Sequence, residues 1–212
     1  MKIVLPENIE GKDNYAFERY LSSEGYLRIA GCDEVGRGPL AGPVIAAAVI
    51  LPSPCDPSIF LDSKVLSHKK RVSLHKKLVD MEAVIGLGTV SENRIDDINI
   101  LQASLLAMKR AITEIGLSER DFILVDGKFT IPVNIPQTPL IKGEYKSASI
   151  AAASIVAKIT RDQFMIQMHE RYPHYNFIKN KGYPTKEHRA AIAQYGICPI
   201  HRLSFKGVKE YA

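Results

Sequence analysis

The stretch AGCDEVGRGPLAGPVIAAAVILP, residues 30–52, holds two apolar runs separated by two acids and a glycine-rich turn. The first run, within 27–33, leads into Asp33 and Glu34, and the second, 44–51, is rich in Val, Ile and Ala. Short apolar runs bounded by turn residues are typical of buried strands. We therefore predict two strands, with a pair of carboxylates at the end of the first.

Further along the chain, apolar runs alternate with segments of helical periodicity. This alternation is typical of a mixed sheet with helices on its faces, so we predict an α/β fold with a five-stranded mixed sheet. A stretch at 172–181 reads as a linker before a small C-terminal helical segment, which places domain bounds at 1–178 for the body and 179–212 for the segment packed on it. The remaining strands are predicted at 83–90, 121–127 and 139–144, and the helices at 14–25, 67–81, 91–115, 147–172 and 185–195.

The composition indicates a globular protein with a sizeable core. Of its 212 residues, 46% are hydrophobic and 24% are charged. No apolar run reaches the length of a membrane span and the N-terminus has no signal-peptide core, so we expect a cytoplasmic protein that binds no membrane, with a monomer as the default. The three cysteines, Cys32, Cys55 and Cys198, lie far apart, which argues against a disulfide framework or a zinc site.

The positive charge is concentrated near the C-terminus. Residues 179–212 contain seven basic and two acidic residues, which equals the whole net charge of +5. A basic segment on an otherwise neutral body favours a polyanionic partner such as nucleic acid. The alternative is a solvated cationic tail with no partner.

The predicted strands carry four carboxylates at or near their ends: Asp33, Glu34, Asp126 and Glu144. If the first and fourth strands are parallel neighbours, their C-terminal ends lie side by side, where open α/β sheets bind ligands. Carboxylates gathered there, with no paired cation close by in the sequence, repel one another unless divalent cations neutralise them. Oxygen ligands favour Mg²⁺ or Mn²⁺, and two such ions about 4 Å apart promote phosphodiester hydrolysis. The alternative is four unrelated strand-end or turn acids.

Strand geometry complicates this cluster. Adjacent residues of a regular strand point to opposite faces, so Asp33 and Glu34 cannot both aim at the same ions from one strand. Either the strand ends at Asp33, or one of the two residues contributes differently, for example through its backbone oxygen.

The turn Gly36, Arg37, Gly38 follows the acids directly. Glycines let the backbone approach a ligand closely, a guanidinium can hold a phosphate, and backbone groups can contact the 2′-hydroxyl that separates RNA from DNA. The turn precedes a strand rather than a helix, so a dinucleotide-binding fingerprint is disfavoured. Tyr183 lies in a basic loop between glycine and proline, where its ring can stack on a base or sugar; packing on the adjacent helix is the alternative.

Two histidines and one further acid receive structural interpretations. His188 and His201 have no partner at metal-ligand spacing, so we interpret them first as helix-surface or hydrogen-bonding residues and second as phosphate contacts. Asp162, mid-helix beside Arg161, is interpreted as structural support.

The motif DEVGRGPLAGPV, which begins at Asp33, resembles the first signature of the ribonuclease HII family. The resemblance covers about residues 28–206, nearly the whole chain. Similar motifs follow in the family's order: LDSKVLS (61–67), ILVDGK (123–128), IKGE (141–144), SIAAASIVAKITRD (149–162), KGYPTKEH (181–188) and GICPIHRLSF (196–205).

This resemblance implies a ribonuclease H-like fold, divalent-metal catalysis and endonucleolytic cleavage of RNA in RNA–DNA hybrids. It also implies cleavage on the 5′ side of a single ribonucleotide embedded in duplex DNA, as in ribonucleotide excision during DNA replication and repair, with 5′-phosphate and 3′-hydroxyl products. Asp33, Glu34 and Asp126 match metal-binding carboxylates of the family. Glu144 stands where the family usually has aspartate, and its extra methylene puts the second metal's geometry in question. Gly36, Arg37, Gly38 and Tyr183 match the elements that recognise the RNA–DNA junction.

Three other interpretations compete with this one. A nucleic-acid binding module without catalysis would use the basic segment and Tyr183, with the acids as structural caps. An enzyme with a phosphate-bearing cofactor would use the glycine turn. The ribonuclease HIII family shares the implied fold and hybrid cleavage, but lacks this glycine-arginine-glycine form and usually carries an additional N-terminal domain.

Overall fold

A computed structural model describes residues 3, 5–6, 9, 13–60 and 66–212. The first five residues of the LDSKVLS motif, 61–65, lie outside the described residues. Within the described part, one five-stranded sheet has the order β3-β2-β1-β4-β5. The strands are β1 (Ile29–Val35), β2 (Val44–Ile50), β3 (Val84–Val90), β4 (Phe122–Asp126) and β5 (Gln137–Leu140).

Strand pairing brings distant parts of the chain together. β1 runs antiparallel to β2 and parallel to β4, with Cys32 opposite Val125. β4 in turn runs parallel to β5. Since parallel strands present their C-terminal ends at the same edge, Asp33 and Asp126 emerge beside one another. The predictions of a mixed α/β sheet and of a parallel β1–β4 pair are confirmed.

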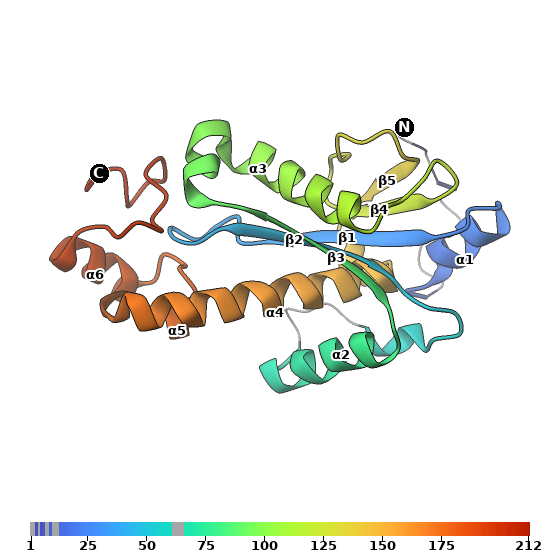
Figure 1. Ribbon diagram of the computed structural model, residues 1–212, viewed down its shortest axis with the longest axis horizontal. Helices are drawn as coiled ribbons and strands as arrows, with labels where there is room; N and C mark the ends of the chain where they lie inside the picture. Colours follow the sequence, from blue (N-terminus) through green and yellow to red (C-terminus); the bar gives the residue numbers. More distant parts are fainter. Residues whose placement is uncertain (1–2, 4, 7–8, 10–12, 61–65) are drawn as a thin grey trace.

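Helices cover both faces of the sheet (Figure 1). On one face α3 packs chiefly on β3 and β2 and also on β1, and on the other face α4 packs on β1 and β2, with α2 against α4. The side chains of Ser67 and Thr185, the first residues of two predicted helices, accept from the N–H groups of Lys70 and His188 and so cap α2 and α6. The helices are α1 (Ala16–Ser23), α2 (His68–Asp80), α3 (Glu92–Glu114), α4 (Ala148–Arg171), α5 (Phe177–Asn180) and α6 (Lys186–Tyr195).

The predicted linker at 172–181 is wrong. A 3₁₀ turn, η4 (Pro173–Tyr175), and the short helix α5 occupy this stretch, and both pack against the end of α4. Tyr175 and Phe177 are buried in a cluster with Leu40, next to the loop that follows β1. The residues from Pro173 onward are therefore joined to the body through a shared apolar core.

The fifth strand differs from its predicted range of 139–144. β5 ends at Leu140, and Lys142 then turns the chain with a left-handed φ of 57°. Glu144 lies in the following 3₁₀ helix, η3 (Gly143–Tyr145), and not at a strand end. The turn brings the chain back toward β4, where the backbone N–H of Gly143 donates to the side chain of Asp126 at 2.7 Å.

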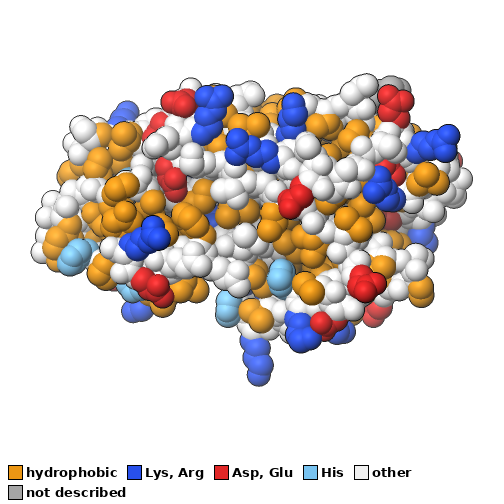
Figure 2. Space-filling view, in the orientation of Figure 1, with side chains coloured by type: hydrophobic (Ala, Val, Ile, Leu, Met, Phe, Trp, Pro, Cys, Tyr) orange, Lys and Arg blue, Asp and Glu red, His pale blue; other side chains and the backbone are white. Residues whose placement is uncertain are grey.

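The surface in Figure 2 carries interspersed positive and negative side chains on the face viewed in Figure 1. None of the helices in the described residues is both long enough and apolar enough to cross a bilayer.

We predict that Gly31→Ala destabilises the fold strongly. A Cβ at Gly31 would lie 2.0 Å from the backbone carbon of Ser149 and 2.1 Å from the backbone nitrogen of Ile150, so β1 and α4 would have to separate. Chemical denaturation should show a loss of about 3 kcal/mol. Gly38→Ala is the control, since its Cβ would meet only the Tyr183 ring at 3.7 Å, and it should change stability by less than about 0.5 kcal/mol. Equal effects of the two substitutions would contradict this account.

Candidate functional site

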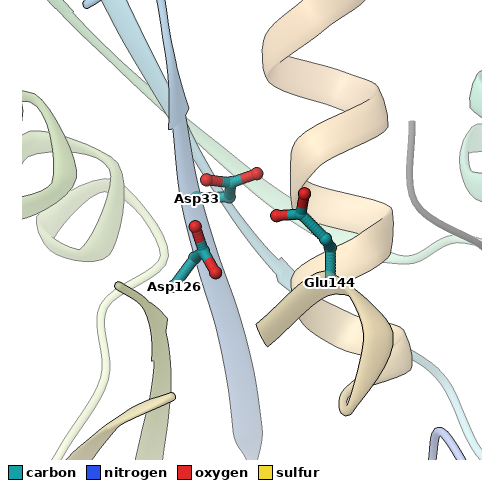
Figure 3. A group of neighbouring side chains, drawn as sticks. All are labelled: Asp33, Asp126 and Glu144. Atoms are coloured by element: carbon teal, nitrogen blue, oxygen red, sulfur yellow. The ribbon is translucent and has the colours of Figure 1, made fainter. Parts of the chain in front are cut away.

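Three carboxylates from separate segments meet at the C-terminal edge of β1 and β4. Asp33 comes from β1, Asp126 from the end of β4 and Glu144 from η3, and Figure 3 shows the three side chains directed toward one another. One carboxylate oxygen of each residue lies within 4.8 Å of the others. Residues separated by more than a hundred positions therefore form one acidic group.

Backbone hydrogen bonds hold two of these carboxylates in place. Asp33 Oδ1 accepts from the N–H of Glu34 at 2.7 Å, and Asp126 Oδ1 accepts from the N–H of Gly143 at 2.7 Å. The second bond links β4 to η3, so that Asp126 and Glu144 are positioned by the same turn.

The burial of Asp33 and Glu144 makes the close approach of the three carboxylates unfavourable in free energy. Asp33 and Glu144 are each 5% exposed. Burial raises the pKa of Asp33 well above its usual range, and the charges of Glu34 and Asp126 raise it further. A set of all-oxygen ligands held close together against repulsion fits a hard divalent cation such as Mg²⁺ or Mn²⁺, which would relieve this repulsion.

Glu34 lies beside this group rather than in it. β1 continues as a regular strand to Val35, so the alternative in which the strand ends at Asp33 is wrong and Glu34 points to the other face. Its carboxylate accepts from the Arg37 guanidinium at 3.1 Å, so the expectation of acids without a nearby cation is also wrong for Glu34. Burial raises the pKa of Glu34 to about 7, although Arg37 opposes the shift.

A cavity of about 460 Å³ joins Glu34 to Asp33 and Asp126 of the acidic group and to Arg37 and Tyr183. The lining residues include Asp33, Glu34, Arg37, Arg71, Asp126, Ser154, Lys158 and Tyr183.

Asp162, for which the sequence predicts structural support, is buried and accepts from Lys158 at 2.7 Å.

Two fully buried arginines hold the glycine loop, which we define as residues 36–43, from the Gly36–Gly38 turn to the start of β2. Arg161 of α4 donates to the backbone carbonyls of Pro43, Ala41 and Lys181 at 2.9–3.0 Å. Arg202 donates to the carbonyls of Gly36, Arg37 and Gly42 at 2.6–3.1 Å.

The predicted role of Arg202, as part of a basic segment that contacts a polyanion, is wrong. Arg202 is 0% exposed and donates to carbonyls of the glycine loop instead. The sequence contains a partial signal for Arg161, which lies in a predicted helix directly after a long run of apolar and small residues. It contains no comparable signal for Arg202.

The glycine loop and Tyr183 form a single structural unit. Gly36 has a φ of 99°, and a Cβ there would lie 2.4 Å from Arg161 Nε, so glycine is required by the buried arginine. The Leu40 N–H donates to the carbonyl of Gly182 at 2.8 Å, beside Tyr183. Arg37 and Tyr183 both line the cavity, and a Cβ at Gly38 would lie 3.7 Å from the Tyr183 ring, so the loop meets Tyr183 at the cavity.

His188 and His201 are buried and hydrogen-bonded to each other, with their Nε2 atoms 3.1 Å apart. The hydrogen-bonding interpretation is confirmed, and the helix-surface one is wrong. Burial also excludes them as direct phosphate contacts in this conformation.

Comparison with known proteins gives a consistent result. The sequence model of the family described as Ribonuclease HII matches residues 30–208. Ribonuclease HII of Desulfotalea psychrophila is 63% identical over 202 residues, which are 94% of this chain and 90% of that protein. Ribonuclease HII of Geobacter metallireducens is 46% identical over 211 residues, which are 100% of this chain and 99% of that protein.

Solved structures share the fold. RNase HII in its complex with PCNA from Archaeoglobus fulgidus matches with a TM-score of 0.69 and 25% identity, covering 85% of this chain and 96% of that one. Bst-RNase HIII in complex with Mn²⁺ matches with a TM-score of 0.67 and 18% identity, covering 90% of this chain and 71% of that one, a likeness of fold alone. The predicted ribonuclease H-like fold is confirmed.

We predict that Asp33→Asn stabilises the metal-free protein. The substitution keeps an Oδ1 acceptor for the Glu34 N–H but removes a buried charge that neighbouring carboxylates repel. In chelator at pH 8, the free energy of unfolding should rise by about 1 kcal/mol or more, since one pKa unit is worth about 1.4 kcal/mol.

Thermal denaturation checks this prediction. Adding Mg²⁺ should raise the melting temperature of the wild-type protein more than that of the variant. Asp80→Asn, which breaks the exposed ion pair of Lys76 and Asp80, is the control and should give no gain in stability. A less stable Asp33→Asn protein in chelator would contradict the repulsion that we assign to the site.

Proposed function

Because this chain belongs to the ribonuclease HII family, we propose that its acidic group and its glycine loop together cleave RNA where RNA is joined to DNA. The chain is a metal-dependent endoribonuclease of the ribonuclease H type. The observation that carries the finer proposal is that one cavity is lined both by carboxylates, those of Asp33, Glu34 and Asp126, and by Arg37 and Tyr183, with Gly38 next to the Tyr183 ring.

Asp33, Asp126 and Glu144 would hold two divalent ions, Mg²⁺ or Mn²⁺, with Glu34 contributing from the other side of β1. When bound, the ions supply activation of a water molecule and positive charge for the departing 3′-oxygen. The donor set supports this assignment, because three carboxylates within 4.8 Å of one another, two of them buried, offer only oxygen ligands. Cleavage on the 5′ side of a ribonucleotide then leaves a 5′-phosphate and a 3′-hydroxyl.

The loop supplies recognition. Backbone groups of Gly36 and Gly38 read the 2′-hydroxyl, the feature that distinguishes RNA from DNA. Arg37 is half exposed and bound to Glu34, so it can exchange this partner for a phosphate of the substrate. Tyr183, exposed next to Gly38, stacks on the sugar of the following deoxynucleotide.

The substrates are accordingly RNA–DNA hybrids and DNA duplexes that contain single ribonucleotides. We propose that the basic residues of 179–212 that remain exposed neutralise phosphates, so that affinity falls with salt. We also propose a monomer in the cytoplasm, where isolated free cysteines remain reduced. In this description 1–178 is the catalytic body and 179–212 the basic segment packed on it.

We predict that Asp126→Asn abolishes cleavage while it preserves the fold. An Asn Oδ1 can still accept from the Gly143 N–H, so η3 should keep its place. On a duplex with one ribonucleotide, the wild-type protein should cut with Mg²⁺ or Mn²⁺ and not with chelator. The variant should lose about a thousandfold or more in rate, in the range typical for loss of a group that acts only in the transition state.

Asp162→Asn is the control, since it removes a buried carboxylate that pairs with Lys158 outside the acidic group. It should retain most of the cleavage rate. Nicking by the Asp126→Asn protein at the wild-type rate would contradict the metal assignment. Binding of the duplex without any nicking by the wild-type protein would favour the non-catalytic binding module.

We predict that Glu144→Asp changes the metal preference. The shorter side chain withdraws the carboxylate by one methylene from the position opposite Asp33 and Asp126. The ratio of cleavage rates with Mn²⁺ and Mg²⁺ should change about threefold or more, because Mg²⁺ requires a stricter octahedral geometry. Rates measured with each metal at saturation check this, and an unchanged ratio would show that the longer side chain has no effect on the ions.

A further inference from the structure

A chain of hydrogen bonds runs through the C-terminal core and ends at the backbone of Tyr183. The Cys198 N–H lies 2.9 Å from His201 Nδ1, and His201 Nε2 lies 3.1 Å from His188 Nε2. His188 Nδ1 lies 3.0 Å from the carbonyl oxygen of Tyr183. The proposed cleavage mechanism assigns no role to either histidine.

Hydrogen-bond chemistry fixes the protons along this chain. The Tyr183 carbonyl can only accept, so His188 carries its proton on Nδ1 and its Nε2 is an acceptor. His201 Nδ1 also lies 3.1 Å from Cys198 Sγ and 3.3 Å from the Cys198 carbonyl, but that carbonyl already accepts from the backbone N–H of His201 at 2.9 Å. The closer Cys198 N–H can only donate, so we assign His201 Nδ1 as an acceptor with the proton on Nε2. The two assignments agree, because His201 Nε2–H then donates to His188 Nε2.

The surroundings keep both rings neutral. His188 and His201 are 0% and 1% exposed, and the rings of Tyr175 and Phe177 pack against both of them. Burial, with the neighbouring His188, lowers the pKa of His201 to about 4, and burial also lowers that of His188. One more proton on either ring would place one N–H against another.

The Tyr183 backbone is held from several sides. Its carbonyl accepts from His188 Nδ1 and from the Thr185 N–H at 2.8 Å, and its own N–H donates to Asn180 at 2.9 Å. Its ring, 39% exposed, is in contact range of Gly38. The orientation of the ring toward the cavity therefore depends on how the carbonyl is anchored.

We propose that His188 and His201 are positioning residues, which set the Tyr183 ring against the glycine loop and so determine the preference for an RNA–DNA junction. This proposal rests on the proposed function of Tyr183. A merely structural role for the histidines would lower stability, or would lower the cleavage of all substrates together. A positioning role changes the ratio between substrates.

The test compares kcat/KM on a duplex with a single ribonucleotide and on a uniform RNA–DNA hybrid, at matched salt and Mg²⁺. His188→Leu removes the donor to Tyr183 and should lower the ratio of the two values about tenfold, the effect of losing one buried hydrogen bond. His188→Asn, whose amide N–H lies near the position of Nδ1, should restore at least half of the loss on a logarithmic scale. His174→Asn, at an exposed histidine of the same region, is the matched control and should leave the ratio unchanged.

Coupling to Tyr183 gives an independent readout. Tyr183→Ala should lower the same ratio, and adding His188→Leu to it should lower the ratio by less than threefold more. A full additional tenfold loss in the double variant would overturn the proposal, as would an unchanged ratio in His188→Leu. A wild-type protein that cuts neither duplex would instead contradict the proposed function itself.

Nitrogen-15 NMR of the wild-type imidazoles tests the proton assignment even if His188→Leu fails to fold. We expect His188 protonated on Nδ1 and His201 on Nε2 at pH 7. The opposite tautomer at either ring, or a charged ring, would overturn the proposed anchoring of Tyr183.

Discussion

Repulsion among the carboxylates of Asp33, Asp126 and Glu144 is the constraint on which the rest of the site depends. Their oxygens lie within 4.8 Å of one another, and two of the residues are nearly fully buried. The fold holds them there through the parallel pairing of β1 with β4 and through the bond from Gly143 to Asp126. In our proposal, divalent cations neutralise this repulsion and make the arrangement a binding site. The same edge of the sheet would then lower the stability of the metal-free fold and serve catalysis.

The loop that we propose for substrate recognition is held by buried positive charge. Arg161 and Arg202 are buried, and their guanidinium groups donate hydrogen bonds to its backbone carbonyls. Glu92, at the start of α3, is buried and its charge acts on both arginines. Planar, multiply donating guanidinium groups can hold several carbonyls of an irregular loop at once. The two arginines therefore tie the loop that we propose for substrate recognition to the core.

Much of this architecture could be predicted from the sequence, because local patterns carry it. Apolar runs ending in acids gave the strands β1 and β4, and capping residues gave the starts of α2 and α6. The predicted placement of Glu144 at a strand end was wrong, because the left-handed turn at Lys142 has no clear signal in a single sequence. The Glu34–Arg37 pair was missed although its residues are only three positions apart, because the pairing depends on how the turn at Gly36 directs the Arg37 side chain. The buried Arg202 and the histidine pair were missed because they depend on contacts between separate segments, which composition and spacing do not reveal.

The most direct test of the account is a crystal of the protein soaked in Mn²⁺ and examined by anomalous scattering. We expect peaks about 2.0–2.2 Å from carboxylate oxygens of Asp33, Asp126 and Glu144, two of them about 4 Å apart once a duplex is bound. The same crystals of an Asp126→Asn protein should lose or weaken these peaks. An active wild-type protein whose Mn²⁺ lies elsewhere, with none between these carboxylates, would contradict the claim that their convergence makes the site.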